Sequence, residues 1–248
     1  MAKPTTIPVV MIHGVGLDHT MWLPVMAALS QRRTIAYDMI GHGAARKPAG
    51  PYTLGTFVDQ LGAIVEAVDC EIDLVGFSMG ALVAQGLALS PIAGRIRTMV
   101  LLNAVHDRSD ADRQAIIARV AEVRAGQFAA TVEPALQRWF TPAFAATHPE
   151  SVAAVGQRLL ANDERSYADA YEVFATADAG LASRVPEITV PTLVATGSDD
   201  QRSTPAMAAA LAAALPRGRA TVLPGLRHLT PLEAPELVAD LIDEFTST

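Results

Sequence analysis

The chain has 248 residues and a formal net charge of −7 at pH 7, which argues against nucleic acid or an anionic membrane surface as its partner. Half of the residues are hydrophobic, yet no apolar run reaches the roughly 18–20 residues that a membrane-spanning helix needs. The single cysteine, Cys70, excludes an internal disulfide and any metal site built from several cysteines.

The first ten residues, MAKPTTIPVV, lack the apolar core and the small-residue cleavage site of a signal peptide, so we expect a cytoplasmic protein. Short apolar runs then recur along the chain, each followed by a turn and a longer helical pattern. Near-continuous apolar runs are typical of strands that are buried on both faces. The expected strands are Ile7–Ile12, Thr34–Asp38, Ile72–Phe77, Thr98–Asn103, Val190–Thr196 and Ala220–Leu223.

Helical patterns fill the segments between these runs. They are Met21–Ser30, Thr53–Asp69, Met79–Ser90, Pro205–Leu215 and Pro235–Phe245. Strands that alternate with helices predict an α/β fold, with a mostly parallel sheet of about six strands and helices on both faces. A ligand of such a sheet is expected beyond the carboxyl ends of the strands.

One stretch, residues 106–185, interrupts this alternation. It contains no strand run, and its helical patterns cover Asp110–Arg124, Phe128–Phe140, Ser151–Ala161 and Ser166–Ala177. An insertion of this kind at the ligand end of a sheet would form a lid. We therefore predict a core made of residues 1–105 and 186–248, with residues 106–185 as a helical lid inserted in it.

Ser78 is the candidate nucleophile. It lies in Gly76-Phe77-Ser78-Met79-Gly80, directly after an expected strand and before an expected helix. In a G-x-S-x-G turn the glycines keep Cβ atoms out of a tight bend, and the serine Oγ is raised above the sheet at a helix N-terminus. The alternative interpretation is a helix-capping serine on a glycine turn.

A serine nucleophile needs a base, and His228 is the candidate because it lies in the loop that follows the last expected strand. The acid that orients this histidine is expected after the fifth strand, where Gly197-Ser198-Asp199-Asp200 offers two adjacent carboxylates. Adjacent side chains on an extended segment point in opposite directions, so only one of them can reach the histidine. We favour Asp200; Asp199 and Asp107 remain alternatives.

The turn His13-Gly14-Val15-Gly16 follows the first expected strand and predicts an oxyanion hole. The backbone N–H of Val15 would be one donor, and that of Met79, directly after the nucleophile, would be the other. Phosphate binding is the alternative role of a glycine-rich turn. The segment lacks the third glycine of a dinucleotide-binding fingerprint, however, and no segment resembles a P-loop.

The segments HGVG, GHG, GFSMG, GSDD and PGLRH, in this order, resemble the α/β-hydrolase superfamily over nearly the whole chain. Within it, the sequence is similar to 3-oxoadipate enol-lactonases, including the lid segments VRAG and RWFT and Tyr167. The resemblance implies the α/β-hydrolase fold and places the acid at Asp200. Phe77, Ala81 and Ala45 depart from the family pattern, which usually has Leu, Gly and Ser there. The antiparallel strands that usually open the fold are expected to be absent or vestigial.

These features together predict a serine hydrolase that cleaves a small ester or lactone through an acyl-enzyme on Ser78. A carbon–carbon bond hydrolase or a cofactor-free perhydrolase would use a similar triad, and a ligand-binding protein could keep the fold without the chemistry. We expect a small-molecule substrate and no metal or organic cofactor. Trp139 and Arg138 of the lid, together with His13, are the candidates for substrate binding; Arg202 and Arg227 are further cations near the site.

Overall fold

The computed structural model describes residues 7–247, so Met1–Thr6, part of the segment that lacks signal-peptide features, lie outside it. A parallel sheet of six strands forms its centre, in the order β2-β1-β3-β4-β5-β6. Their bounds are β1 (Val9–Ile12), β2 (Thr34–Tyr37), β3 (Ile72–Phe77), β4 (Ile96–Leu102), β5 (Thr192–Gly197) and β6 (Gly218–Leu223). The predicted α/β fold with a parallel sheet is confirmed.

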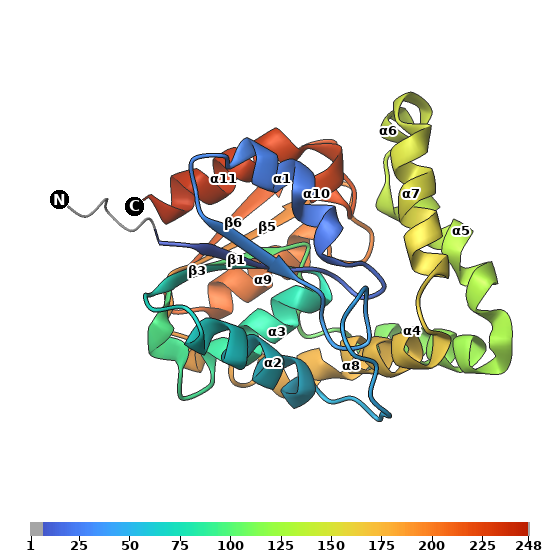
Figure 1. Ribbon diagram of the computed structural model, residues 1–248, viewed down its shortest axis with the longest axis horizontal. Coiled ribbons are helices and arrows are strands. Elements are labelled where there is room, and N and C mark those ends of the chain that lie inside the picture. The colour runs from blue at the N-terminus through green and yellow to red at the C-terminus, as the bar shows by residue number, and fades with distance from the viewer. Residues whose placement is uncertain (1–6, 248) are drawn as a thin grey trace.

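Helices cover both faces of this sheet (Figure 1). On one face α1 (Leu23–Ala28), entered through a 3-10 turn at His19–Trp22, packs against α11 (Pro235–Thr246), next to the short α10 (Thr230–Glu233). On the other face lie α2 (Leu54–Glu66), α3 (Met79–Ala88) and α9 (Pro205–Ala214). Two of these helices begin after a threonine N-cap, Thr53 for α2 and Thr204 for α9. Each threonine side chain accepts a hydrogen bond from a free N–H of the first turn.

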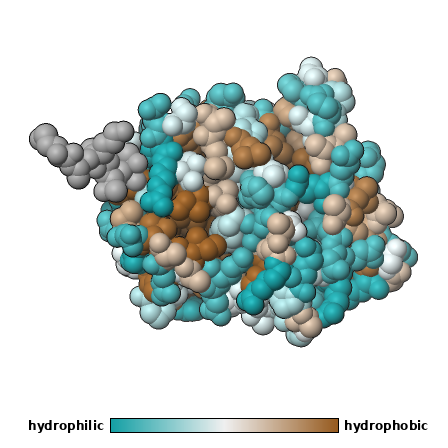
Figure 2. Space-filling model, in the orientation of Figure 1, coloured by the Kyte–Doolittle hydropathy of each residue, from teal (hydrophilic) through white to brown (hydrophobic). Residues whose placement is uncertain are grey.

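The buried strands explain the continuous apolar runs of the sequence. Every residue of β1, β3 and β5 is buried, because each of these strands has a neighbour on both sides and helices above and below. The edge strand β2 differs, since all four of its residues are only half-buried. In Figure 2 apolar surface gathers over this edge of the sheet, whereas the lid presents mostly hydrophilic residues.

The strand order reverses between β1 and β3, which creates the crevice in which open α/β sheets bind their ligands. From β1 the chain runs to β2 on one side and then returns to β3 on the other side. The loops that leave β1 and β3 therefore diverge, and a pocket opens above them. Both the Gly14–Gly16 turn and Ser78 follow these two strands directly.

Five α-helices without a strand separate β4 from β5 (Figure 1). Of these, α4 (Asp110–Glu122) packs against α8 (Glu164–Ala182), and α5 (Phe128–Trp139) packs against α7 (Pro149–Leu160). A kinked segment at Val123–Gln127 joins α4 to α5, and its Gly126 has a non-helical backbone with φ +81°. The sequence patterns did not predict α6 (Pro142–Thr147), and they placed the start of α8 two residues too late. Among residues 7–247, no helix has both the length and the apolar character needed to cross a bilayer.

Candidate active site

Ser78 lies on a strained turn between β3 and α3. Its backbone has φ 53° and ψ −114°, a conformation that residues other than glycine rarely adopt. A Cβ on Gly80 would lie 2.4 Å from the carbonyl oxygen of Ile12, and one on Gly76 would lie 2.5 Å from that of Gly80. Both positions therefore require glycine, because α3 begins in direct contact with β1 and β3. The Ser78 hydroxyl is held at the carboxyl end of the sheet.

An unbroken chain of hydrogen bonds joins Ser78, His228 and Asp200. The Nε2 atom of His228 lies 3.2 Å from the Ser78 Oγ, and its Nδ1 lies 2.7 Å from the Asp200 Oδ2. All three residues are buried, at 8% exposure or less. The imidazole is packed between the rings of Phe77 and Trp139, whose centroids lie 5.1 and 5.9 Å from its own. This packing limits the ring to orientations that keep both hydrogen bonds.

Asp200 is held as a carboxylate by donors on both of its oxygens. The Oδ1 atom accepts from the backbone N–H groups of Arg202 and Ser203, each at 3.0 Å, and Oδ2 accepts from the Asn103 side-chain amide at 2.9 Å. Burial alone would raise the pKa of Asp200, but the charge and hydrogen bond of His228, with these donors, lower the pKa to about 2. The group is thus negatively charged at any physiological pH.

Sequence reasoning missed Asn103, the residue that positions this carboxylate. It follows β4, is fully buried, and has a φ of 49°. Its amide contacts Asp200, while its carbonyl oxygen accepts from the Thr230 hydroxyl at 2.7 Å in the segment after His228. Asn103 therefore bonds to both the acid and the histidine segment. A polar residue at the end of an apolar strand run was the signal that could have identified it.

The two alternative acids lie elsewhere. Asp199 is exposed, and its Oδ1 accepts from the Ser198 hydroxyl at 2.6 Å. Asp107, at φ 44°, is also exposed and does not line the cavity described below. Of the three candidate acids, the structure brings Asp200 to His228.

The turn after β1 lies beside Ser78. Val15 lines the same cavity as Ser78, and Met79 is the first residue of α3, where a backbone N–H has no acceptor within the helix. A lid residue holds this turn in place, since the Asn162 side-chain amide donates to the carbonyl oxygen of Gly16 at 2.8 Å. The turn is therefore linked directly to the lid.

His13 does not occupy the substrate-binding position that we expected. It is fully buried, its Nε2 accepts from the Met39 N–H at 2.9 Å, and its Nδ1 lies 2.7 Å from the carbonyl oxygen of Gly14. Burial lowers the pKa of His13 to about 4, so the ring is neutral. His13 does not line the cavity, because both of its ring nitrogens bond to backbone groups that shape the turn.

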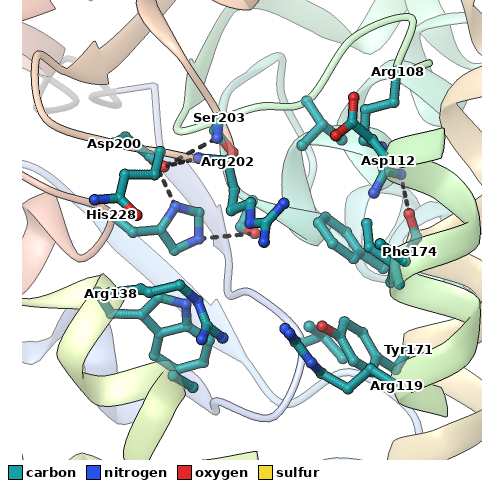
Figure 3. Close-up of a pocket in the computed structure, with 18 of the residues that line it drawn as sticks. Arg108, Asp112, Arg119, Arg138, Tyr171, Phe174, Asp200, Arg202, Ser203 and His228 are labelled. Carbon is teal, nitrogen blue, oxygen red and sulfur yellow. Dashed lines mark hydrogen bonds and ion pairs between the residues drawn. The ribbon is translucent and has the colours of Figure 1, made fainter.

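A cavity of about 210 Å³ opens above Ser78, between the carboxyl ends of the strands and helices α4, α5 and α8. Ser78 lines it, and Asp200 and His228 lie across from Arg119, Tyr171 and Phe174 (Figure 3). Trp139 and Arg138, both half-buried at the end of α5, line it together. The lining from the lid includes Arg108, Arg119, Tyr167, Tyr171 and Phe174.

Arg227, by contrast, ties the histidine loop to the lid. Its guanidinium donates to the carbonyl oxygens of Gln137 and Phe140, at 2.6 and 3.0 Å. The N–H of Leu229 donates to the carbonyl oxygen of Trp139 at 3.1 Å. These bonds satisfy free carbonyl groups at the C-terminal end of α5 and hold His228 against the lid. Arg227 does not line the cavity.

One group of potential metal ligands lies outside the cavity, on the loops that follow β1 and β2. Asp18, His19 and Asp38 bring ligand atoms within 4.8 Å of one another. Protein groups already bind these side chains. Asp18 pairs with Arg158 of α7, and Asp38 accepts from the backbone and ring of His19. The arrangement joins the loop after β1, the loop after β2 and α7.

Comparison with known proteins identifies the family of the chain. The model of the Alpha/beta hydrolase family matches residues 9–241. The chain belongs to this family, and it is a hydrolase of the α/β-hydrolase superfamily.

Its relatives include several characterised hydrolases. (E)-2-((N-methylformamido)methylene)succinate hydrolase of Acinetobacter baylyi is 33% identical over 97% of this chain and 90% of its own length. 3-Oxoadipate enol-lactonase 2 of the same organism is 31% identical over 77% of this chain and 71% of its own. The crystal structure of the enol-lactonase from Burkholderia xenovorans LB400 has a TM-score of 0.90 and 30% identity, covering 98% of this chain and 92% of that one. The expected resemblance to enol-lactonases is confirmed.

Proposed function

We propose that this hydrolase cleaves a small ester or lactone through an acyl-enzyme on Ser78. The proposal rests above all on the hydrogen-bond chain from Ser78 through His228 to Asp200, which borders the cavity. A serine hydroxyl becomes an effective nucleophile when an adjacent base takes its proton, and the base needs a third group to fix its tautomer. The enol-lactonase relatives point to the same bond type.

The reaction proceeds in two halves. His228 Nε2 removes the hydroxyl proton as Ser78 Oγ attacks the substrate carbonyl carbon, and Asp200 stabilises the resulting imidazolium. The negative charge on the carbonyl oxygen is held by the N–H groups of Val15 and Met79. The carbon–oxygen bond to the leaving group then breaks, and the leaving oxygen takes the proton from His228. Water, activated by the same histidine, hydrolyses the acyl-enzyme and releases the free acid.

The size of the cavity supports a small substrate. Its volume of about 210 Å³ lies below the range of roughly 300–1,000 Å³ that is usual for drug-sized ligands. Trp139, Tyr167 and Phe174 provide apolar walls. A lactone or a short-chain ester matches this combination of small volume and mixed lining.

The experiment combines covalent labelling with turnover. A fluorophosphonate should add one label per wild-type chain at Ser78, detected by peptide mass spectrometry. Ser78→Ala should lower kcat for p-nitrophenyl acetate by about 10⁶-fold, as loss of a triad nucleophile does in other enzymes. Ser183→Ala, an exposed serine on the lid, is the matched control and should behave as wild type.

Two outcomes would count against this function. A Ser78→Ala variant that keeps a tenth of wild-type activity would exclude the serine mechanism. Turnover of dienones in a substrate panel, without turnover of any ester or lactone, would favour carbon–carbon bond hydrolysis by the same residues.

A further inference from the structure

Positive charge is concentrated in the cavity in excess of what the protein itself neutralises. Four arginines line it: Arg108, Arg119, Arg138 and Arg202. Arg108 is paired, because its guanidinium contacts Asp178 at 2.8 Å and lies 4.6 Å above the Phe174 ring. Asp178 also pairs with Arg113 at 2.8 Å, and this buried cluster anchors the start of α4 to α8. The Arg108 guanidinium therefore already has a carboxylate partner in the protein.

The other three, Arg119, Arg138 and Arg202, form the arginine trio. Within residues 7–247, none of their side chains has an ion pair or a hydrogen bond to protein, although Arg119 and Arg138 are half-buried. Unpaired guanidinium groups are costly when partly removed from water, and mutual repulsion adds to that cost. Burial, and then the charges of Arg119 and Arg202, lower the pKa of Arg138. The trio is therefore an arrangement that an anion would stabilise.

The three guanidinium groups come from different elements and meet across the cavity. Arg119 is on α4, Arg138 is near the end of α5, and Arg202 follows β5, two residues after Asp200. Figure 3 shows Arg119 and Arg138 pointing toward each other below the triad, with Arg202 beside Asp200 and His228. Positive charge thus lies both next to the reacting groups and on the opposite wall, near Tyr171.

The balance of charge indicates how many anionic groups the cavity accepts. Asp200 is committed to His228, so Asp112 is the remaining carboxylate of the lining, and it accepts from the Ser109 hydroxyl at 2.6 Å. Three unpaired cations against this one anion leave a surplus of two positive charges. Arginine binds carboxylates through two parallel N–H donors, so separated guanidinium groups suit separated carboxylates.

We propose that the substrate is a dianion with two carboxylate groups, bound by Arg119, Arg138 and Arg202 so that its ester or lactone carbonyl lies at Ser78. The position of the carbonyl at Ser78 rests on the proposed function, whereas binding of the dianion by the three arginines does not. One carboxylate lies near the triad at Arg202, and the other lies between Arg119 and Arg138. A neutral ester of the same size would leave the trio without partners and would bind weakly.

A matched series of acetate esters tests this specificity. O-acetylmalate, O-acetyllactate and isopropyl acetate carry two, one and no carboxylates on similar alcohols. For the wild type, kcat/KM should rise by at least tenfold with each carboxylate. Arg119→Gln, Arg138→Gln and Arg202→Gln should each lower kcat/KM for O-acetylmalate by about 10- to 100-fold, the range of a charge-assisted hydrogen bond. The control Arg165→Gln removes the same charge from an exposed site on α8 and should leave every value within twofold.

Binding without turnover separates this inference from the mechanism. Calorimetry with Ser78→Ala should show succinate binding at least tenfold more tightly than butyrate, and each trio substitution in that background should remove the difference. This result would stand even if Ser78 proved not to be the nucleophile. Equal binding of succinate and butyrate, equal turnover of the three acetates, or unchanged values in all trio variants would overturn the proposal. Tighter binding of inorganic phosphate than of succinate would overturn it in favour of a phosphate-bearing ligand.

Discussion

Replacement of Asp200 by asparagine should inactivate the enzyme while leaving its shape almost unchanged. The Oδ1 atom of Asp200 accepts from two backbone N–H groups, those of Arg202 and Ser203. An asparagine would therefore keep its carbonyl oxygen toward these donors and turn its NH₂ group toward His228. The Nδ1 atom of His228 must then accept a hydrogen bond, which leaves the proton on Nε2. In this tautomer Nε2 cannot take a proton from Ser78.

The size of the effect follows from this tautomer. In a serine triad the wrong tautomer costs about 10⁴-fold in kcat, equivalent to about 5 kcal/mol of transition-state stabilisation. The NH₂ group would also face the amide of Asn103, which now donates to Asp200 Oδ2 at 2.9 Å. Loss of that acceptor should lower the free energy of unfolding by about 1–3 kcal/mol.

The assay is hydrolysis of p-nitrophenyl acetate, with urea unfolding measured in parallel. Asp199→Asn is the matched control, because Asp199 is exposed and contacts Ser198 rather than the triad. It should keep kcat within about twofold of wild type, as expected of a surface substitution. Equal losses in the two variants, or a larger loss in Asp199→Asn, would refute the argument from the geometry of Asp200.

Three further predictions concern the lid, the oxyanion turn and acid stability. Trp139→Ala should raise KM for the preferred substrate by about tenfold, because a cavity wall is lost; a fall in Tm with unchanged KM would show that Trp139 only packs the lid. Asn162→Ala, which frees the Gly16 carbonyl, should lower kcat by about 5- to 10-fold with little change in KM, less than the loss of an oxyanion donor; an unchanged kcat would contradict this role. Burial lowers the pKa of His13 from 6.5 to about 4 and that of His42 from 6.5 to about 3. Below pH 6.5 these histidines therefore bind more protons in the unfolded chain than in the folded protein. The free energy of unfolding should thus be greatest above pH 6.5 and fall by about 3 kcal/mol between pH 6.5 and 5; urea titrations that show no fall would disprove it.

Local sequence was sufficient for the parts of the site that neighbouring residues define. The strained turn at Ser78 needs glycine at positions 76 and 80, and both glycines can be recognised in the five-residue motif G-x-S-x-G. The strands could also be predicted from the sequence, because a strand covered on both faces must be apolar along its whole length. His228 could be predicted as the base because, in a sheet of parallel strands, the loop after the last strand lies at the same end as Ser78.

Other features were decided only when distant elements packed together. Asp199 and Asp200 are adjacent and chemically equivalent, and the choice between them depends on which side of the loop after β5 faces His228. The buried position of His13 depends on its hydrogen bond to Met39, 26 residues later in the chain. Local sequence patterns do not predict such contacts, because each contact depends on how two distant elements are oriented relative to each other.

The arginine trio shows the same limit most clearly. Arg119 lies on α4, Arg138 on α5 and Arg202 after β5, so no local sequence pattern brings the three together. Sequence reasoning named Arg138 as a substrate-binding candidate and Arg202 and Arg227 as further cations near the site, but the guanidinium of Arg227 binds the carbonyl groups at the end of α5. The sequence by itself determined the sheet and the glycine turn at Ser78, and it predicted Ser78, Asp200 and His228 as a triad. Only the packing of the lid over the sheet decided which charges face the cavity. The physical reason is that whether an arginine has a carboxylate partner depends on residues that are distant in the sequence and come close to it only in the folded protein.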